Sequence, residues 1–286
     1  MLDEIFQNSN EPPAPPDRRS ADIGIVCTYR EEVRPLLKAL DRLRSYIDEG
    51  AMFRGGFIDE MTRVAVVEAG PGFAAHRRAT ETLIAEHHPV WVLSVGFSSS
   101  LSPEVSAGDI CLANEICDTH GNAVAIRCTI PESRRVFVRR HVVADQHPCT
   151  AEEKSRLAEA TGAAVVDTTS AAVAQVCAET VDVPSTADGS DSAGDDVVPA
   201  KPAPVKARFL SIRGIIDSAE ESLSAEAVAY MFHPEPQKPN PVATVLKRFR
   251  RDPQRAAWDA RVADASKNLN RYLLSVVRQI AERIAR

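Results

Sequence analysis

The most constraining feature of the sequence is a repeated alternation of short apolar runs and segments with helical spacing. Residues 23–29 (IGIVCTY) form an apolar run typical of a buried parallel strand, and apolar residues then recur at helical steps over 31–43. Further strands are expected at 63–68, 90–97, 109–116, 136–144, 165–166 and 209–216, and further helices at 74–87, 150–160, 170–177 and 256–286. This order predicts an α/β fold with a mixed, largely parallel central sheet that helices flank on both faces.

Three polar stretches interrupt the alternation. Residues 1–21 are expected to form a flexible N-terminal arm, because 7–20 are polar and rich in proline. Residues 178–207 are rich in Asp, Ser, Ala and Pro, which predicts a disordered acidic insertion. Strand-like sequence resumes after this insertion, so residues 22–286 are expected to form one domain, with prolines extending the chain at 232–241.

Charge and hydropathy restrict the class of partner. The net charge of -6 and the isoelectric point near 5.7 argue against a protein that binds nucleic acid through bulk positive charge. No apolar run approaches the ~18 residues that span a bilayer, and residues 1–22 lack the features of a secretory signal. The expected location is the cytoplasm, without a nucleic-acid or membrane partner.

The six cysteines occur singly, with no C-x-x-C pair, which is typical of reduced thiols in a cytosolic protein. Cys111, Cys117 and His120 could be imagined as metal ligands, but their spacing matches no zinc module. Neither a metal nor a cofactor is expected.

The final helical segment has one apolar and one basic face. A basic amphipathic helix can bind a membrane or a partner protein, whereas a terminal helix more commonly packs on the sheet. Asp259, Asp264 and Glu282 interrupt the basic face, which favours packing on the sheet.

In a largely parallel sheet, functional residues are expected just past the strands. Glu32 and Asp217 are two acidic residues at such positions. Each also has an ordinary structural explanation, Glu32 as a first-turn acid favoured by the helix dipole and Asp217 as an N-cap. From spacing alone, these structural roles are favoured.

Five sequence blocks, in order, resemble the methylthioadenosine/S-adenosylhomocysteine nucleosidases of the purine nucleoside phosphorylase superfamily. They are IGIVCTYREEV at 23–33, VAVVEAGPGFAAHRRATETLI at 64–84, VLSVGFSSSLSPEVSAGDICLANEI at 92–116, VVDTTSAAVAQVC at 165–177 and FLSIRGIIDSAEES at 209–222. Residues 144–154 also resemble a subgroup, the hopanoid-associated nucleoside phosphorylases. The resemblance implies a nucleoside phosphorylase-like fold and a homo-oligomer.

The resemblance also implies cleavage of the N-glycosidic bond of a purine nucleoside. Glu32 matches the carboxylate that activates water, Asp217 the acid that protonates the leaving base, and Arg213 the arginine that supports them. Substrate contacts are expected from Tyr29, Phe97, Ser98, Thr168 and Thr169. A water-activating carboxylate on one side of the sugar and an acid on the other is the arrangement of inverting glycosidases.

Several positions depart from the family pattern. Thr169 stands where a carboxylate grips the ribose hydroxyls, and a threonine cannot accept two hydrogen bonds with a full negative charge. Phe97 replaces a small serine, and residues 98–100 are serines in place of a glycine-rich turn.

Three functions therefore stay open. The first is a nucleosidase with changed sugar-side specificity, and the second is a phosphate-dependent phosphorylase. Ser94 counts against the phosphorylase, because such enzymes usually carry an arginine there. The third is a non-catalytic homologue that binds a nucleoside.

Overall fold

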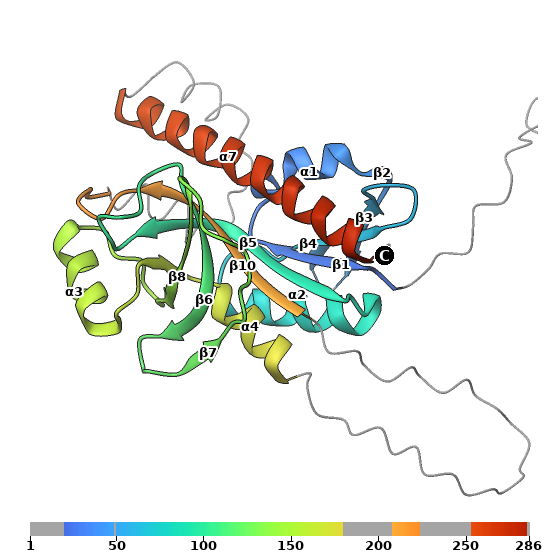
Figure 1. The fold of residues 1–286 in the computed structure, drawn as a ribbon, viewed down its shortest axis with the longest axis horizontal. Coiled ribbons are helices and arrows are strands. Elements are labelled where there is room, and N and C mark those ends of the chain that lie inside the picture. The colour runs from blue at the N-terminus through green and yellow to red at the C-terminus, as the bar shows by residue number, and fades with distance from the viewer. Residues whose placement is uncertain (1–19, 49, 180–207, 224–252, 285–286) are drawn as a thin grey trace, which may run out of the picture.

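The structure is a computed structural model that describes residues 20–48, 50–179, 208–223 and 253–284 (Figure 1). The strands are β1 (Ile23–Cys27), β2 (Asp41–Asp48), β3 (Ala51–Phe57), β4 (Arg63–Glu68), β5 (Trp91–Ser100), β6 (Ile110–Asp118), β7 (Ala123–Ala125), β8 (Val136–Val143), β9 (Val165–Asp167) and β10 (Arg208–Asp217). The helices are the 3-10 turn η1 (Arg30–Glu32), α1 (Arg34–Ala39), α2 (Phe73–His87), α3 (Ala151–Thr161), α4 (Ser170–Glu179) and α7 (Pro253–Ile284).

All the described strands belong to one mixed sheet, which confirms the predicted α/β fold class. The strand order is β10-β6-β8-β9-β5-β1-β4-β3-β2, with β7 on β6. The central strands β4, β1, β5 and β10 are mutually parallel. Because β10 also pairs with β6 and β9 with β5, the strands β5, β10, β6, β8 and β9 close into a ring.

Helices cover both faces of the sheet. Helix α7 lies across one face beside α1, while α2 and α4 lie against the other (Figure 1). The apolar side of α7 is buried, since Leu269, Leu273 and Val277 pack into the main core cluster with residues of β1, β5 and β10. The prediction that this helix packs on the sheet is confirmed. Within the part of the chain that the structure describes, no helix combines the length and apolarity needed to cross a membrane.

The predicted elements are found with one clear correction. The helix expected over 31–43 is wrong in its second half, because α1 ends at Ala39 and β2 begins at Asp41. Arg42 has a φ of 52°, a left-handed conformation that does not continue a right-handed helix. The hairpin of β2 and β3 was not expected, since β2 is exposed along nearly its whole length and lacks a strand's apolar alternation.

Strand β2 is an edge of the sheet: it pairs with β3, and no other described strand pairs with it. Its register with β3 shifts between Asp41 and Arg44, which marks a bulge at the left-handed Arg42. Ile47 on this strand is 70% exposed.

The predicted N-terminal arm and acidic insertion fall mainly outside the described residues, as does the proline-rich stretch at 232–241. Of the arm, Ala21 is buried, and its amide donates a hydrogen bond to the carbonyl of His87. Of the insertion range, only residues 178 and 179 are described, and they end α4.

Candidate active site

Glu32 lies at the end of η1, directly beyond the carboxyl end of β1, and is buried. Its Oε2 accepts hydrogen bonds from the amides of Thr28 (2.7 Å) and Tyr29 (3.0 Å). Its Oε1 accepts a third from the amide of Phe97 on β5, at 3.3 Å. The carboxylate is therefore held between two parallel strands by three backbone donors.

Burial raises the pKa of Glu32 from 4.5 to about 7. The amides of Tyr29 and Thr28 and the charge of Arg213 act in the opposite direction, because they stabilise the ionised form. A carboxyl group with this pKa can exchange a proton at neutral pH, which is the property required of a general base.

A buried ion pair lies next to Glu32. Nε of Arg213 on β10 donates to Oδ2 of Asp167 at 3.0 Å, and Nη2 donates to Oγ of Ser94 at 2.8 Å. Oδ1 of Asp167 accepts from the amides of Thr169 and Ser170, both at 2.7 Å. Burial alone would raise the pKa of Asp167, but Arg213 and these donors lower it to about 2, so Asp167 stays ionised.

Gly96 lets Arg213 and Glu32 approach each other across β5. A Cβ atom at position 96 would lie 3.1 Å from Nη1 of Arg213 and 3.3 Å from Oε1 of Glu32. Both distances are tighter than most real Cβ contacts, so a side chain at this position would require Arg213 or Glu32 to shift by a few tenths of an ångström.

A small cavity opens in front of this cluster, with a volume of about 10 Å³. This is roughly the room that one water molecule requires. The cavity is lined by Thr28, Glu32, Gly96, Phe97, Asp167, Thr168 and Thr169. In this conformation the site accommodates a water beside Glu32 and does not accommodate a nucleoside.

Asp217 ends β10 and is fully buried, but it is not among the residues that line the cavity. Its carboxylate accepts hydrogen bonds from Oγ of Ser99 and from Nζ of Lys154. Nζ of Lys154 also donates to the carbonyls of Ser218 (2.7 Å) and Glu221 (2.8 Å). Burial raises the pKa of Asp217, while Lys154 and Ser99 oppose that rise.

A buried histidine stands behind the cavity. Nε2 of His76 lies 3.3 Å from Oγ1 of Thr28, and its Nδ1 lies 3.1 Å from the carbonyl of Gly72. Burial lowers the pKa of His76 to about 4, so the ring is neutral near pH 7. Among the described residues, no group of three or more His, Cys, Asp or Glu side chains is placed to hold a metal ion.

Comparisons with known proteins found one matching family model and several solved structures of similar fold. A family model described as the phosphorylase superfamily matches residues 22–145, the segment that includes Glu32, Gly96 and Phe97. This match covers less than half of the chain and is consistent with a divergent member of the superfamily. No curated protein matches it by sequence.

Several solved structures share the fold of this chain. The 5'-methylthioadenosine/S-adenosylhomocysteine nucleosidase of Neisseria meningitidis, in complex with methylthio-immucillin-A, is 15% identical with a TM-score of 0.61, covering 90% of this chain and 98% of that one. The futalosine hydrolase of Helicobacter pylori is 18% identical with a TM-score of 0.59, and the match covers 91% of this chain and 98% of that one. At these identities the likeness establishes the fold alone.

Most of the residues expected from the superfamily resemblance lie together. Glu32, Phe97, Thr168 and Thr169 line the cavity, and Arg213 stands behind it. Tyr29 contributes its amide to Glu32. These contacts follow from the strand order, because β1, β5 and β10 are neighbours whose carboxyl ends meet at one edge.

Two of the expected residues lie apart from the cavity. Asp217 faces Lys154 and Ser99, as described above. Ser98 is completely buried, and within the described part of the chain its hydroxyl has no hydrogen-bond partner.

Three further residues of this site, Asp167, Lys154 and Ser99, were not among those predicted from the sequence. Asp167 could have been found, because it ends a strand immediately before Thr168. Lys154 carried no such signal, since a lysine in the first turns of a polar helix is normally solvated. Ser99 was noted only as part of a serine run.

Proposed function

We propose that this chain is an N-ribosyl hydrolase that cleaves the glycosidic bond of a purine nucleoside, with Glu32 activating the water. The observation that carries the proposal is the Glu32 carboxylate itself: it is held by three amides, has a pKa of about 7 and faces a water-sized cavity. The match to the superfamily model and the fold shared with a nucleosidase support the same reaction class.

In the proposed reaction, the Glu32 carboxylate takes a proton from the water as the water oxygen bonds to the anomeric carbon of the ribose. The bond from that carbon to the purine nitrogen breaks, and its electron pair stays on the base. Arg213 lies close enough to stabilise negative charge beside the water, while Asp167 fixes its guanidinium.

The departing base needs a proton, and we assign its delivery to Asp217. Both acids meet strand β5 near its carboxyl end: Glu32 accepts from the amide of Phe97, and Asp217 accepts from the hydroxyl of Ser99. An acid and a base at separate points around the reacting sugar is the arrangement that inverting glycosidases use. Burial raises the pKa of Asp217, the direction that a proton donor requires.

Substrate binding requires the cavity to enlarge, since it now has the volume of one water. Phe97, Thr168 and Thr169 form the wall on the proposed ribose side. Tyr29 and Ser98 do not line the cavity, but each directly follows a lining residue, Thr28 and Phe97 respectively. Thr168 and Thr169 would offer hydroxyls to the sugar in place of a carboxylate, which supports a changed sugar-side specificity.

A non-catalytic nucleoside-binding homologue is the second candidate, and the Lys154–Asp217 pair specifically favours it. An aspartate held by a lysine is a weaker proton donor than one in an apolar pocket. A phosphorylase has less support, because position 94 is a serine whose hydroxyl already bonds Arg213.

The test is release of free base from methylthioadenosine, S-adenosylhomocysteine, adenosine and inosine, with and without phosphate. We expect release without phosphate, and its loss in Glu32→Gln. Glu31→Gln is the matched control, because Glu31 is the exposed neighbour on the same turn. Nucleoside binding with no release from this panel would favour the non-catalytic homologue, and release only with phosphate would identify a phosphorylase.

We further propose that residues 22–286 act as one domain, in the cytoplasm, as a homo-oligomer without a cofactor. The superfamily resemblance supports the assembly, and the six free cysteines support a reducing compartment. Light scattering of the purified chain would test the assembly, and a monomer at micromolar concentration would contradict it.

A further inference from the structure

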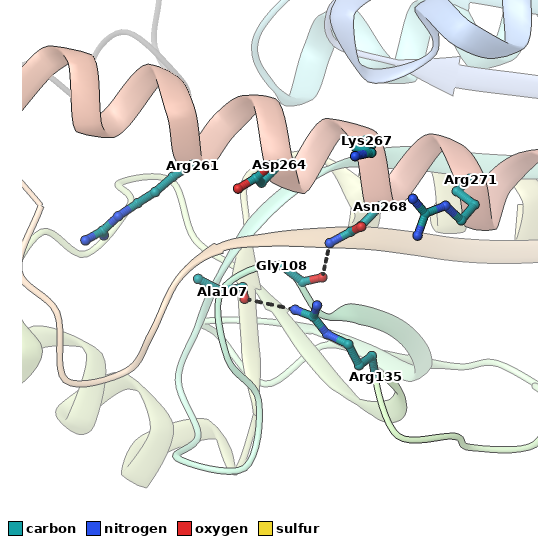
Figure 2. A pocket seen from close by; sticks show the side chains of 8 residues that line it. All are labelled: Ala107, Gly108, Arg135, Arg261, Asp264, Lys267, Asn268 and Arg271. Atoms are coloured by element: carbon teal, nitrogen blue, oxygen red, sulfur yellow. Dashed lines mark hydrogen bonds between the residues drawn. The ribbon is translucent and has the colours of Figure 1, made fainter.

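A second and larger cavity lies between α7 and the loop that precedes β6, with a volume of about 350 Å³ (Figure 2). It is lined by Ala107, Gly108, Arg135, Arg261, Asp264, Lys267, Asn268 and Arg271. It shares no lining residue with the cavity beside Glu32. Its volume is within the range of about 300–1,000 Å³ that is usual for small-molecule sites.

Positive charge dominates this cavity, with four cationic side chains around one acid. Two of these cations form ion pairs with acids that do not line the cavity. Arg135 pairs with Asp109 at 2.8 Å, and Arg261 pairs with Glu221 at 2.8 Å. Lys267 and Arg271 have no ion pair within the described ranges of the chain. They are four residues apart on α7, so they lie on the same side of the helix.

The wall opposite α7 is held in place. Nδ2 of Asn268 donates to the carbonyl of Gly108 at 3.0 Å, and Nη2 of Arg135 donates to the carbonyl of Ala107 at 3.3 Å (Figure 2). Gly108 has a φ of 84°, and a Cβ there would lie 2.7 Å from Nη2 of Arg135. The positive φ favours glycine at this position, and a side chain there would displace the Arg135 guanidinium from the loop.

We infer that this cavity binds the phosphate group of a small phosphorylated molecule. Guanidinium groups match phosphate oxygens geometrically, and Lys267 adds a compact charge. Asp264 can accept a hydrogen bond from a hydroxyl of the same ligand. An anionic membrane is a poorer occupant, because the apolar side of α7 is buried in the core and cannot enter lipid.

The test is calorimetric titration of the full chain with sodium pyrophosphate at an ionic strength of about 0.15 M, where long-range attraction is screened. We expect saturable binding at one site per chain, weakened at least tenfold in the double variant Lys267→Gln/Arg271→Gln. The matched control is Arg278→Gln/Arg283→Gln, which removes two exposed charges farther along α7. We expect the control to bind within twofold of the unmodified chain, with all three proteins melting at similar temperatures.

Several results would overturn the inference. Absence of saturable pyrophosphate binding would show that the cavity is not a specific anion site. Equal weakening of binding in both double variants would show that the anion is attracted by the general positive charge of α7. Weakening by Glu32→Gln but not by Lys267→Gln/Arg271→Gln would place the anion in the candidate active site. Binding to vesicles of anionic lipid that is lost in the first double variant, without binding of pyrophosphate, would assign the cavity to a membrane surface.

Discussion

Lys154 and Asp217 form an ion pair in which neither side chain is exposed to solvent. The lysine comes from α3 and the aspartate from the end of β10, so the pair fastens this helix to the central sheet. All three protons of the ammonium group have acceptors, namely Asp217 and the carbonyls of Ser218 and Glu221. The same contact limits how readily Asp217 can serve as a proton donor.

Removing only one partner of the Lys154–Asp217 pair should lower the stability of the folded protein. Lys154→Met leaves the Asp217 carboxylate buried without its counter-charge, so we expect a loss of about 3–5 kcal/mol in the free energy of unfolding. Lys154→Met/Asp217→Leu should recover most of that loss. Urea denaturation measures both, with Arg140→Met as control, because the partly exposed Arg140–Glu115 pair should contribute less than about 1 kcal/mol. Equal losses in the single and double variants would refute the coupling.

The raised pKa of Glu32 predicts how stability depends on pH. Between about 4.5 and 7 the folded chain binds a proton at Glu32 that the unfolded chain has released, so stability falls as pH rises through this window and is level above it. The size of this fall is of the order of 3 kcal/mol. Urea denaturation at several pH values should show Glu32→Gln gaining stability relative to the unmodified chain across this window. Glu31→Gln should show no such trend. If the stabilities of Glu32→Gln and the unmodified chain changed in parallel with pH, the raised pKa of Glu32 would be contradicted.

The rate of base release should follow the ionisation of the same group. If Glu32 acts as the general base, kcat/KM rises with pH with a midpoint near the Glu32 pKa of about 7, and it falls again at the pH where Asp217 loses the proton that the base requires. The measurement is the initial rate of base release across this range. A rate that falls over the same range would identify a protonated group as the essential one.

Arg213 should stabilise the protein mainly through Asp167. Arg213→Met leaves the Asp167 carboxylate buried with only its amide donors, so we expect a loss of about 3–5 kcal/mol near pH 7. In the unmodified chain the ionised Asp167 stabilises the folded state above about pH 4, because its pKa is lowered from 3.8 to about 2. This stabilisation is lost as the pH falls toward 2. The stability difference between the two proteins should therefore narrow as the medium becomes acidic. Arg213→Met/Asp167→Asn should be less destabilised than Arg213→Met at pH 7.

Gly96→Ala should disturb the site without changing a charged group. The added methyl would press on Arg213 and Glu32, so we expect destabilisation of about 1–3 kcal/mol and loss of base release. Gly55→Ala is the matched control on β3, because a Cβ there meets only the Val64 carbonyl at an ordinary 3.7 Å. Similar effects in both variants would indicate a general strand effect rather than crowding of the site.

Apolar patterning was sufficient to predict the central strands, because β1, β4, β5 and β10 are largely buried and are mainly apolar in sequence. The capping box of Thr150 and Glu153 likewise located the start of α3. The β2–β3 hairpin could not be predicted in this way, because β2 buries almost nothing and its position is set by pairing with β3.

The site was predicted only where its residues follow strands. Glu32, Thr168 and Thr169 stand just past strands and meet at the cavity. The inward turn of Lys154 could not be predicted, because its partner Asp217 lies 63 residues away and the contact exists only once α3 packs against the end of β10.

The edge formed by β2 has a consequence for how copies of this protein can associate. An edge strand offers unpaired amides and carbonyls to any neighbouring chain, and long flat edges are sites of aggregation. Here Asp41, Arg42, Arg44 and Asp48 place charge along the strand, and the bulge at Arg42 bends it. Continuation of the sheet from one molecule into the next is therefore disfavoured at this edge, and self-association there would have to use side chains such as Ile47 instead.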